Sequence, residues 1–152
     1  MIEPLRVVKE LDCSAGHAFR VWTERFATWW PLGHTVSASA RTRVVLEPRP
    51  GGRIYEVGPD GAEIEWGEVT TWDPPHRFGY LWHLRRDRAD ATDVDIRFHE
   101  GEEPERCRLE IVHTGWERLG ADGPAWRDAN RGGWRGLLPH YLAALAPADR
   151  AG

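Results

Sequence analysis

The C-terminal run 124–145 constrains the fold more than any other part of the sequence. On a helical projection its apolar and aromatic residues fall on one broad stripe, while its charged residues lie elsewhere. The stripe contains Trp126, Gly133, Trp134, Leu137, Leu138, Tyr141 and Leu145. Because so aromatic a face needs a large apolar partner, we expect a β-sheet that curls around this helix.

The same run also contains residues that disfavour a helix. Each of Gly132, Gly133 and Gly136 costs about 1 kcal/mol relative to Ala in a helix interior. Pro139 removes a backbone donor and clashes with the preceding turn. We therefore expect a break near Gly132-Gly133 and a kink at Pro139. A kink would hold part of the helix away from the sheet and leave room for a ligand.

The pattern upstream of this helix is mostly that of β-strands. Residues 5–12 predict a first strand, and Ser14 is a suitable N-cap for helical segments that end at 30–33. A small-residue loop follows at 35–42. Period-two alternation then predicts six strands joined by short turns, at 43–47, 53–57, 62–72, 77–84, 93–98 and 106–114. This order indicates an α+β fold with an antiparallel sheet.

In such a meander the first strand can only join an edge of the sheet or pair with the last strand. If it pairs antiparallel with 106–114, its end meets the start of the last strand. Cys13 would then lie close to Cys107, with both side chains on the inner face. In a reducing compartment we expect two buried thiols there, with a disulfide as the minor alternative.

Length and composition limit the classes of function. The 152 residues suit a single domain, 1–152, and the net charge of −4 gives no general attraction to nucleic acid. The sequence has neither a signal-peptide pattern nor an apolar run of membrane length, so we expect a soluble, cytoplasmic protein without a membrane span. The nine tryptophans exceed what a core of this size requires, and such side chains usually line an interface or a cavity.

Several short motifs, in this order, resemble one known family. They are Trp29-Trp30-Pro31, residues 50–56 (Pro-Gly-Gly-Arg-Ile-Tyr-Glu), Trp66-Gly67-Glu68-Val69, Trp72-Asp73-Pro74-Pro75, residues 113–117 (His-Thr-Gly-Trp-Glu) and Gly133-Trp134. Over nearly the whole chain, the sequence resembles the bacterial single-domain homologues of the heat-shock protein 90 ATPase activator, which belong to the START-like or SRPBCC superfamily.

The resemblance implies a helix-grip fold: a curved antiparallel sheet wrapped around a long C-terminal helix, with two short helices after the first strand and a cavity between sheet and helix. The superfamily includes lipid carriers, aromatases, cyclases and hydrolases, so the fold alone does not select one activity. The eukaryotic activator carries an additional N-terminal domain, whereas the first strand here begins almost at Met1.

Aromatic residues dominate the set expected to face the central cavity. Flat, rigid rings suit an aromatic or lipophilic ligand that is held by contact area. The candidate ligand-binding residues are Trp29, Trp30, Tyr55, Trp66, Tyr80, Trp82, His113, Trp116, Trp134 and Tyr141. The alternatives are that the rings fill the interior completely, or that exposed tryptophans form a homodimer interface.

Three titratable residues are the candidates for catalysis. Strand parity turns His113 inward, where a neutral imidazole could act as a general base. Glu56 and Glu68 lie on strands that face the expected cavity, and burial could raise the pKa of either carboxyl. We favour a core histidine and solvated glutamates over catalytic roles for these residues. The histidine spacing gives no metal site, and no motif implies a cofactor.

We therefore expect a module that binds a small hydrophobic or aromatic molecule, and we favour binding over catalysis. One alternative is a cyclase- or hydrolase-type enzyme with His113 and a glutamate as acid and base, which requires both side chains to face one open pocket. The other is a protein-interaction role of the chaperone-activator kind.

Overall fold

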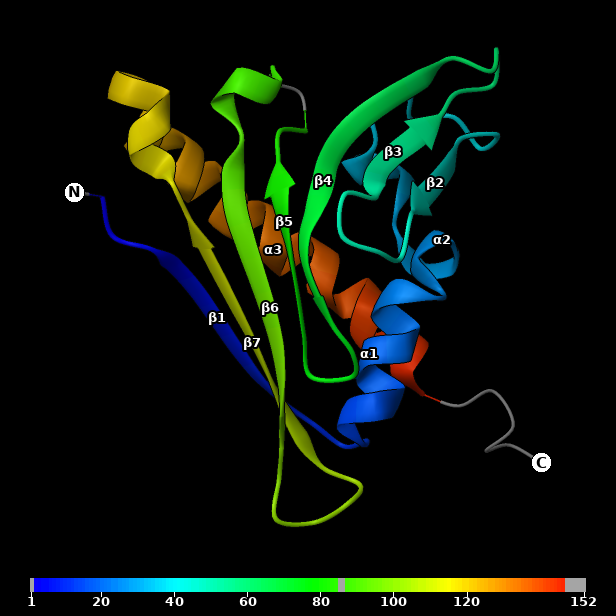
Figure 1. Ribbon diagram of the computed structural model, residues 1–152. Coiled ribbons are helices and arrows are strands. Elements are labelled where there is room, and N and C mark those ends of the chain that lie inside the picture. Colours follow the sequence, from blue (N-terminus) through cyan, green and yellow to red (C-terminus); the bar gives the residue numbers. More distant parts are fainter. Residues whose placement is uncertain (1, 85–86, 147–152) are drawn as a thin grey trace.

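The computed structural model describes residues 2–84 and 87–146, and in these it shows a seven-stranded antiparallel sheet packed on a long helix (Figure 1). The strands are β1 (Leu5–Leu11), β2 (Arg43–Leu46), β3 (Arg53–Val57), β4 (Glu63–Asp73), β5 (Arg77–Trp82), β6 (Thr92–Glu100) and β7 (Cys107–Thr114). The α-helices are α1 (Ala15–Thr23), α2 (Phe26–Trp29) and α3 (Gly123–Leu145). Short 3-10 turns are η1 (Leu32–His34), η2 (Arg88–Asp90) and η3 (Trp116–Asp122).

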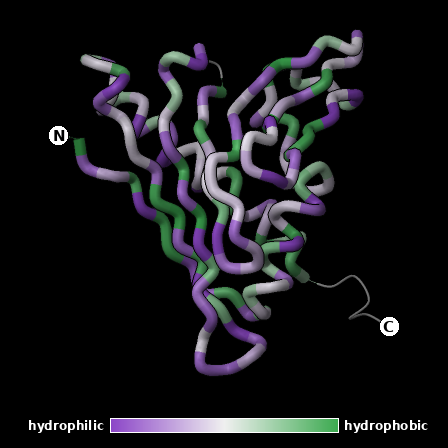
Figure 2. The backbone as a smooth tube through the Cα atoms, in the orientation of Figure 1, coloured by the Kyte–Doolittle hydropathy of each residue, from purple (hydrophilic) through white to green (hydrophobic). Residues whose placement is uncertain are grey.

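Strands β2 to β7 form a meander, and the first strand, β1, pairs with β7 at one edge of the sheet. Its strand order is β1-β7-β6-β5-β4-β3-β2, so β1 and β2 form the two edges (Figure 1). The predicted pairing of the first and last strands is confirmed, because Leu11 lies opposite Cys107 and Leu5 opposite His113. Green and purple segments alternate along these strands in Figure 2, as expected for a sheet with one buried face.

Cys13 and Cys107 are neighbours, as predicted. Both are buried free thiols, and they lie close enough for each to affect the pKa of the other. This contact lowers the pKa of Cys13, whereas for Cys107 the same contact and burial raise the pKa.

The C-terminal helix corrects one prediction. Helix α3 is continuous from Gly123 to Leu145, so the break expected near Gly132-Gly133 is absent. The predicted apolar stripe is confirmed, because Trp134, Leu137, Leu138, Tyr141 and Leu145 are buried. Their packing on the sheet and on α1 stabilises the helix by more than its glycines destabilise it, since most helical stability in proteins comes from tertiary contacts.

A bulge in β4 interrupts the alternation of side chains between the two faces of the sheet. The face on which each nearby residue lies is therefore hard to predict from the sequence. The register shifts between Ile54 and Tyr55 on β3, and Trp66 and Gly67 are both buried as a result. A Cβ atom at Gly67 would lie 2.0 Å from the carbonyl oxygen of Leu81 on the next strand. Only glycine therefore allows β4 and β5 to approach each other at this point.

Substitution of Gly67 by Ala should lower the free energy of unfolding by about 1–3 kcal/mol, because the backbone must move to relieve the overlap. The control is Gly132→Ala on the exposed side of α3, where a Cβ would meet nothing within 4 Å. That change should stabilise the protein by about 0.5–1 kcal/mol. Urea denaturation measures both, and equal stability of the two variants would contradict the interpretation.

Candidate functional site

Most of the predicted ligand-binding side chains lie in one continuous layer between the sheet and α3. Eight of the ten are buried there: Trp29, Trp30, Trp66, Tyr80, His113, Trp116, Trp134 and Tyr141. Trp82 is partly buried at the border of the layer. Tyr55 is not part of it, because it alternates with the buried Ile54 and Glu56 and its ring stacks under Arg53, at 4.2 Å, on the outer face.

Aromatic rings fill the space between the sheet and the helix. Trp22 lies at the centre, with its ring centroid 4.6 Å from that of Tyr141, 5.1 Å from Trp29 and 6.2 Å from Trp134. The hydroxyl of Tyr141 donates to the carbonyl of Ala18 at 2.7 Å, which ties α3 to α1. The protein's own rings therefore fill the space between the sheet and the helix, where a ligand cavity was expected.

His113 is held by hydrogen bonds at both ring nitrogens. Trp134 Nε1 donates to His113 Nδ1 at 3.3 Å, so the proton of the neutral ring is on Nε2 and is directed at Thr92 Oγ1, 2.7 Å away. Thr92 in turn donates to the carbonyl of Trp82 at 3.3 Å. Burial lowers the pKa of His113 to about 3. The imidazole is therefore neutral near pH 7, and its nitrogens bind protein groups.

Glu56 is a completely buried carboxylate that binds a loop. It accepts hydrogen bonds from Val36 N at 2.6 Å, from Ser37 N at 2.9 Å and from Trp66 Nε1 at 2.9 Å. The hydroxyl of Ser37 adds a fourth at 2.5 Å. Burial opposes ionisation, but the hydrogen bonds outweigh it and hold the pKa of Glu56 below its usual value. Glu56 thus fixes the segment that connects η1 to β2.

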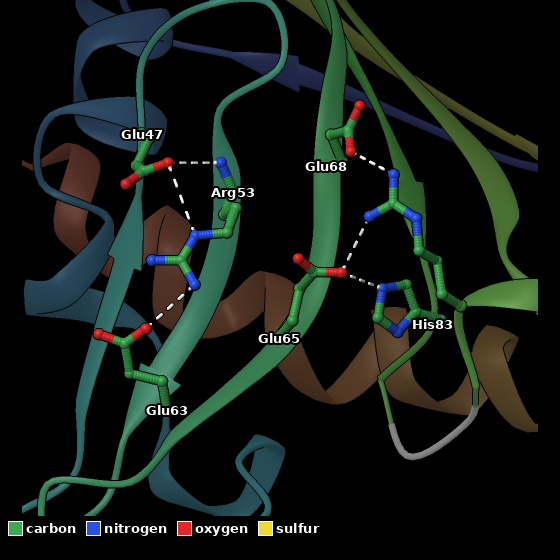
Figure 3. Close-up of polar contacts among 7 residues, drawn as sticks. Glu47, Arg53, Glu63, Glu65, Glu68 and His83 are labelled. Atoms are coloured by element: carbon green, nitrogen blue, oxygen red, sulfur yellow. Dashed lines mark hydrogen bonds and ion pairs between the residues drawn. The ribbon is translucent and has the colours of Figure 1, made fainter.

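Glu68 lies on the outer face of the sheet, opposite Arg53 on β3 and Leu81 on β5. There it pairs with Arg88, which also binds Glu65 at 3.0 Å. His83 contacts the same Glu65, with Nε2 at 3.1 Å from the carboxylate (Figure 3). A second set on this face links Arg53 to Glu47 and Glu63 (Figure 3).

The three catalytic candidates therefore do not converge on a common space. His113 binds Thr92 and Trp134, Glu56 binds the 36–37 loop, and Glu68 is on the opposite face of the sheet. The geometry gives no support to an acid–base pair built from them. In residues 2–84 and 87–146, no group of three His, Cys, Asp or Glu side chains is placed to hold a metal ion. No helix of the same ranges is long and apolar enough to cross a membrane.

A small aromatic pocket opens at the border of the filled layer. We call it the aromatic mouth; its volume is about 60 Å³, and it is lined by Trp30, His34, Trp82, Leu84, Asn130, Gly133, Trp134 and Leu137. A second depression of about 20 Å³ adjoins it and shares Trp82, Leu84 and Asn130. Drug-sized ligands usually occupy about 300–1,000 Å³, so the mouth as it stands accepts only part of such a molecule.

The tryptophans of the mouth were predicted from the sequence, and Gly133 and Leu137 were part of the predicted helical stripe, whereas His34, Leu84 and Asn130 were not predicted. Asn130, Gly133 and Leu137 come from successive turns of α3, so Asn130 extends the predicted stripe to the border of the mouth. A Cβ atom at Gly133 would meet nothing within 4 Å, so the glycine leaves open space in the mouth. The recurrence of these residues at spacings of three and four was the signal that could have found them.

His113 should make stability dependent on pH. Its pKa is about 3 in the folded protein and about 6.5 when unfolded. The unfolded chain therefore binds a proton that the folded chain does not, and stability falls as the pH drops below about 6.5, by up to about 1.4 kcal/mol per unit. His113→Gln should remove this contribution between pH 6.5 and 5, a window above the titration of Glu56. Urea unfolding at several pH values measures the slope; equal slopes in both proteins would contradict the assignment.

Comparisons with known proteins give the chain a family. Residues 12–146 match the model of the family described as Activator of Hsp90 ATPase homolog 1-like protein. No curated protein sequence gives a significant match. Among solved structures, protein MLL2253 from Mesorhizobium loti is similar with a TM-score of 0.69 and 17% identity, over 99% of each chain.

Two further solved structures are similar to this chain. An anthrahydroquino-γ-pyrone synthase, Txn09, has 29% identity and a TM-score of 0.56, over 97% of this chain and 90% of that one. PFC0360w, an HSP90 activator from Plasmodium falciparum, has 16% identity and a TM-score of 0.67, over 93% of this chain and 95% of that one. With a family match over most of its length and a sheet that grips a C-terminal helix, this chain belongs to the family of Activator of Hsp90 ATPase homolog 1-like proteins.

Proposed function

We propose that this protein binds a flat aromatic molecule at the aromatic mouth. The observation that carries the proposal is the convergence of three tryptophans from separate elements on one opening: Trp30 after α2, Trp82 at the end of β5, and Trp134 on α3. Ring faces at such an opening hold a planar ligand by contact area and stacking. The ligand is held at the border of the grip, since the interior is filled.

Because the volume of the mouth is small, a side chain at its border must move before a ligand can enter. Trp82 and Leu84 are only partly buried at its border, so their side chains can move with less rearrangement than the buried rings behind them. Outward rotation of either side chain joins the mouth to the adjoining depression, with which it shares both residues and Asn130. One edge of a planar ligand then inserts between Trp30 and Trp134, while the rest stays on the surface.

Polar groups at the mouth suit a hydroxylated or carbonyl-bearing ring. The side-chain nitrogen of Asn130 donates to the carbonyl of Trp126 at 2.9 Å, which directs the amide oxygen away from that bond. Within the described part of the chain that oxygen has no hydrogen-bond partner, so it can accept from a ligand hydroxyl. One oriented acceptor among apolar walls is typical of sites where a few polar groups fix the ligand's orientation.

The relationship to a synthase supports an aromatic ligand class. Txn09 is named for a product that combines an anthrahydroquinone with a γ-pyrone, and its 29% identity extends over nearly the full length of this chain. By contrast, the Plasmodium activator is 16% identical, which supports a shared fold and not chaperone activation. Because His113 and Glu56 are engaged by protein groups, we propose binding or carriage of the ligand without acid–base catalysis by these residues.

We place the protein in a reducing compartment such as the cytoplasm. The two adjacent thiols, Cys13 and Cys107, are free and buried, and thiols of this kind persist where disulfides are kept reduced.

Substitution of Gly133 by Leu should block the mouth. Its side chain would occupy the open space next to Trp30 and Trp134, and Leu has the better helix propensity, so the fold should be retained. With 1,2-dihydroxyanthraquinone as the probe and tryptophan fluorescence as the readout, we expect saturable quenching in the unmodified protein. Binding to the Gly133→Leu variant should be weaker by about tenfold or more, the loss of roughly one stacked ring contact.

Gly132→Leu is the matched control, because Gly132 is exposed on the same helix and does not line the mouth. Its affinity should stay close to that of the unmodified protein. The proposal fails if the unmodified protein shows no saturable quenching with the probe, or if both leucine variants bind it equally well.

A further inference from the structure

A second, larger groove lies between the edge strand β1 and helix α3. Its volume is about 360 Å³, within the range of small-molecule sites. We call it the β1–α3 groove; it is lined by Leu5, Arg6, Val7, Val8, Lys9, Arg131, Arg135, Leu138, Pro139 and Leu142. It shares no residue with the aromatic mouth. Figure 1 shows β1 at the edge of the sheet, with only β7 beside it.

The charges along this groove are all positive. Four of its residues are cationic and none is acidic, although the whole chain has a net charge of −4. Arg6 pairs with Glu110 at 2.6 Å, and Arg131 with Asp128 at 3.1 Å. Within the described ranges, Lys9 and Arg135 have no ion pair. The groove thus holds two cations from opposite walls whose charge the protein leaves available to an anion.

Lys9 occupies a position where the strand pattern calls for an apolar residue. On β1 it is in phase with Leu5, Val7 and Leu11, and it lies opposite the buried Leu109 of β7. It is also the only lysine in the chain. A lysine at a sheet edge often extends its stem along apolar surface to reach water. Lys9 lines one wall of the groove and Arg135 the other.

The apolar walls give the groove its second chemical property. Leu5 and Leu138 are buried beneath it, and Val7, Pro139 and Leu142 extend the apolar surface along its length. Leu142 is one of the few large apolar side chains that remain exposed, at 37%. An apolar strip with cations at its border is complementary to a molecule that has one anionic end and one hydrocarbon chain.

We propose that the β1–α3 groove binds a single-chain anionic amphipath of the fatty-acid class. The carboxylate is held by Lys9 and Arg135, and the acyl chain lies on Leu5, Val7, Leu138, Pro139 and Leu142. The site is separate from the one proposed for an aromatic ligand. An extended polyanion such as a nucleic acid is disfavoured, because the groove contributes only four cations to a protein with a net charge of −4.

Calorimetric titration with sodium decanoate, below its micellar range, tests the proposal. The unmodified protein should bind one decanoate with an affinity about fourfold higher per added methylene across octanoate, nonanoate and decanoate, as expected for burial of the chain. Higher salt should weaken binding, since the cations are near the surface. The double variant Lys9→Gln/Arg135→Gln should bind about tenfold or more weakly, the loss expected when hydrogen bonds to charged groups are removed.

The control double variant is Arg43→Gln/Arg108→Gln, which removes the same charge from exposed positions on β2 and β7 outside the groove. It should bind decanoate as the unmodified protein does, and so should Gly133→Leu, because the aromatic mouth is a different site. The proposal is overturned if the unmodified protein shows no saturable binding, if both double variants weaken equally, if 1-decanol binds as tightly as decanoate, or if Gly133→Leu abolishes binding.

Discussion

The hydrogen bond from Trp134 to His113 joins the two layers of this protein inside a largely apolar core. Through Thr92 it extends to the carbonyl of Trp82, so that one chain of polar contacts links α3, β7, β6 and β5. Because every member is satisfied, the network fixes the rotation of α3 on the sheet. It also fixes the position of Trp134, and with it one wall of the aromatic mouth.

A filled interior changes where function can be located in a fold of this kind. Trp22, Trp29 and Tyr141 occupy the volume that a carrier would leave for its cargo. Ligands are therefore expected at openings where the helix and the sheet diverge, and the aromatic mouth and the β1–α3 groove are two such openings of contrasting character. One is small and aromatic, and the other is elongated, apolar and cationic. The two openings suit different classes of molecule on one scaffold.

Strand parity and turn chemistry predicted most of the fold, including the pairing of β1 with β7 and the contact of Cys13 with Cys107. The break expected at Gly132-Gly133 was wrong. Helix propensity is a local property and does not include the stabilisation that burial of Trp134 on the sheet gives to the helix. In the site, parity correctly turned His113 inward, whereas the expectation of a solvated Glu56 was wrong, because this carboxylate is completely buried. Parity could not show that a loop distant in sequence saturates Glu56, or that the bulge beside Gly67 puts Glu68 on the outer face. Those outcomes depend on contacts between segments that are far apart in the sequence, and the alternation of residues within one strand does not reveal such contacts.

Lys9 also gives the protein an unusual chemical selectivity. It supplies the only ε-amine of the chain, so an amine-acylating reagent has a single side-chain target, and that target is on the wall of the β1–α3 groove. The arginines that make up the rest of the positive charge do not react with such reagents, because a guanidinium stays protonated. The extent of acylation at this one position is thus a footprint of whatever occupies the groove, in purified protein or in a cell extract.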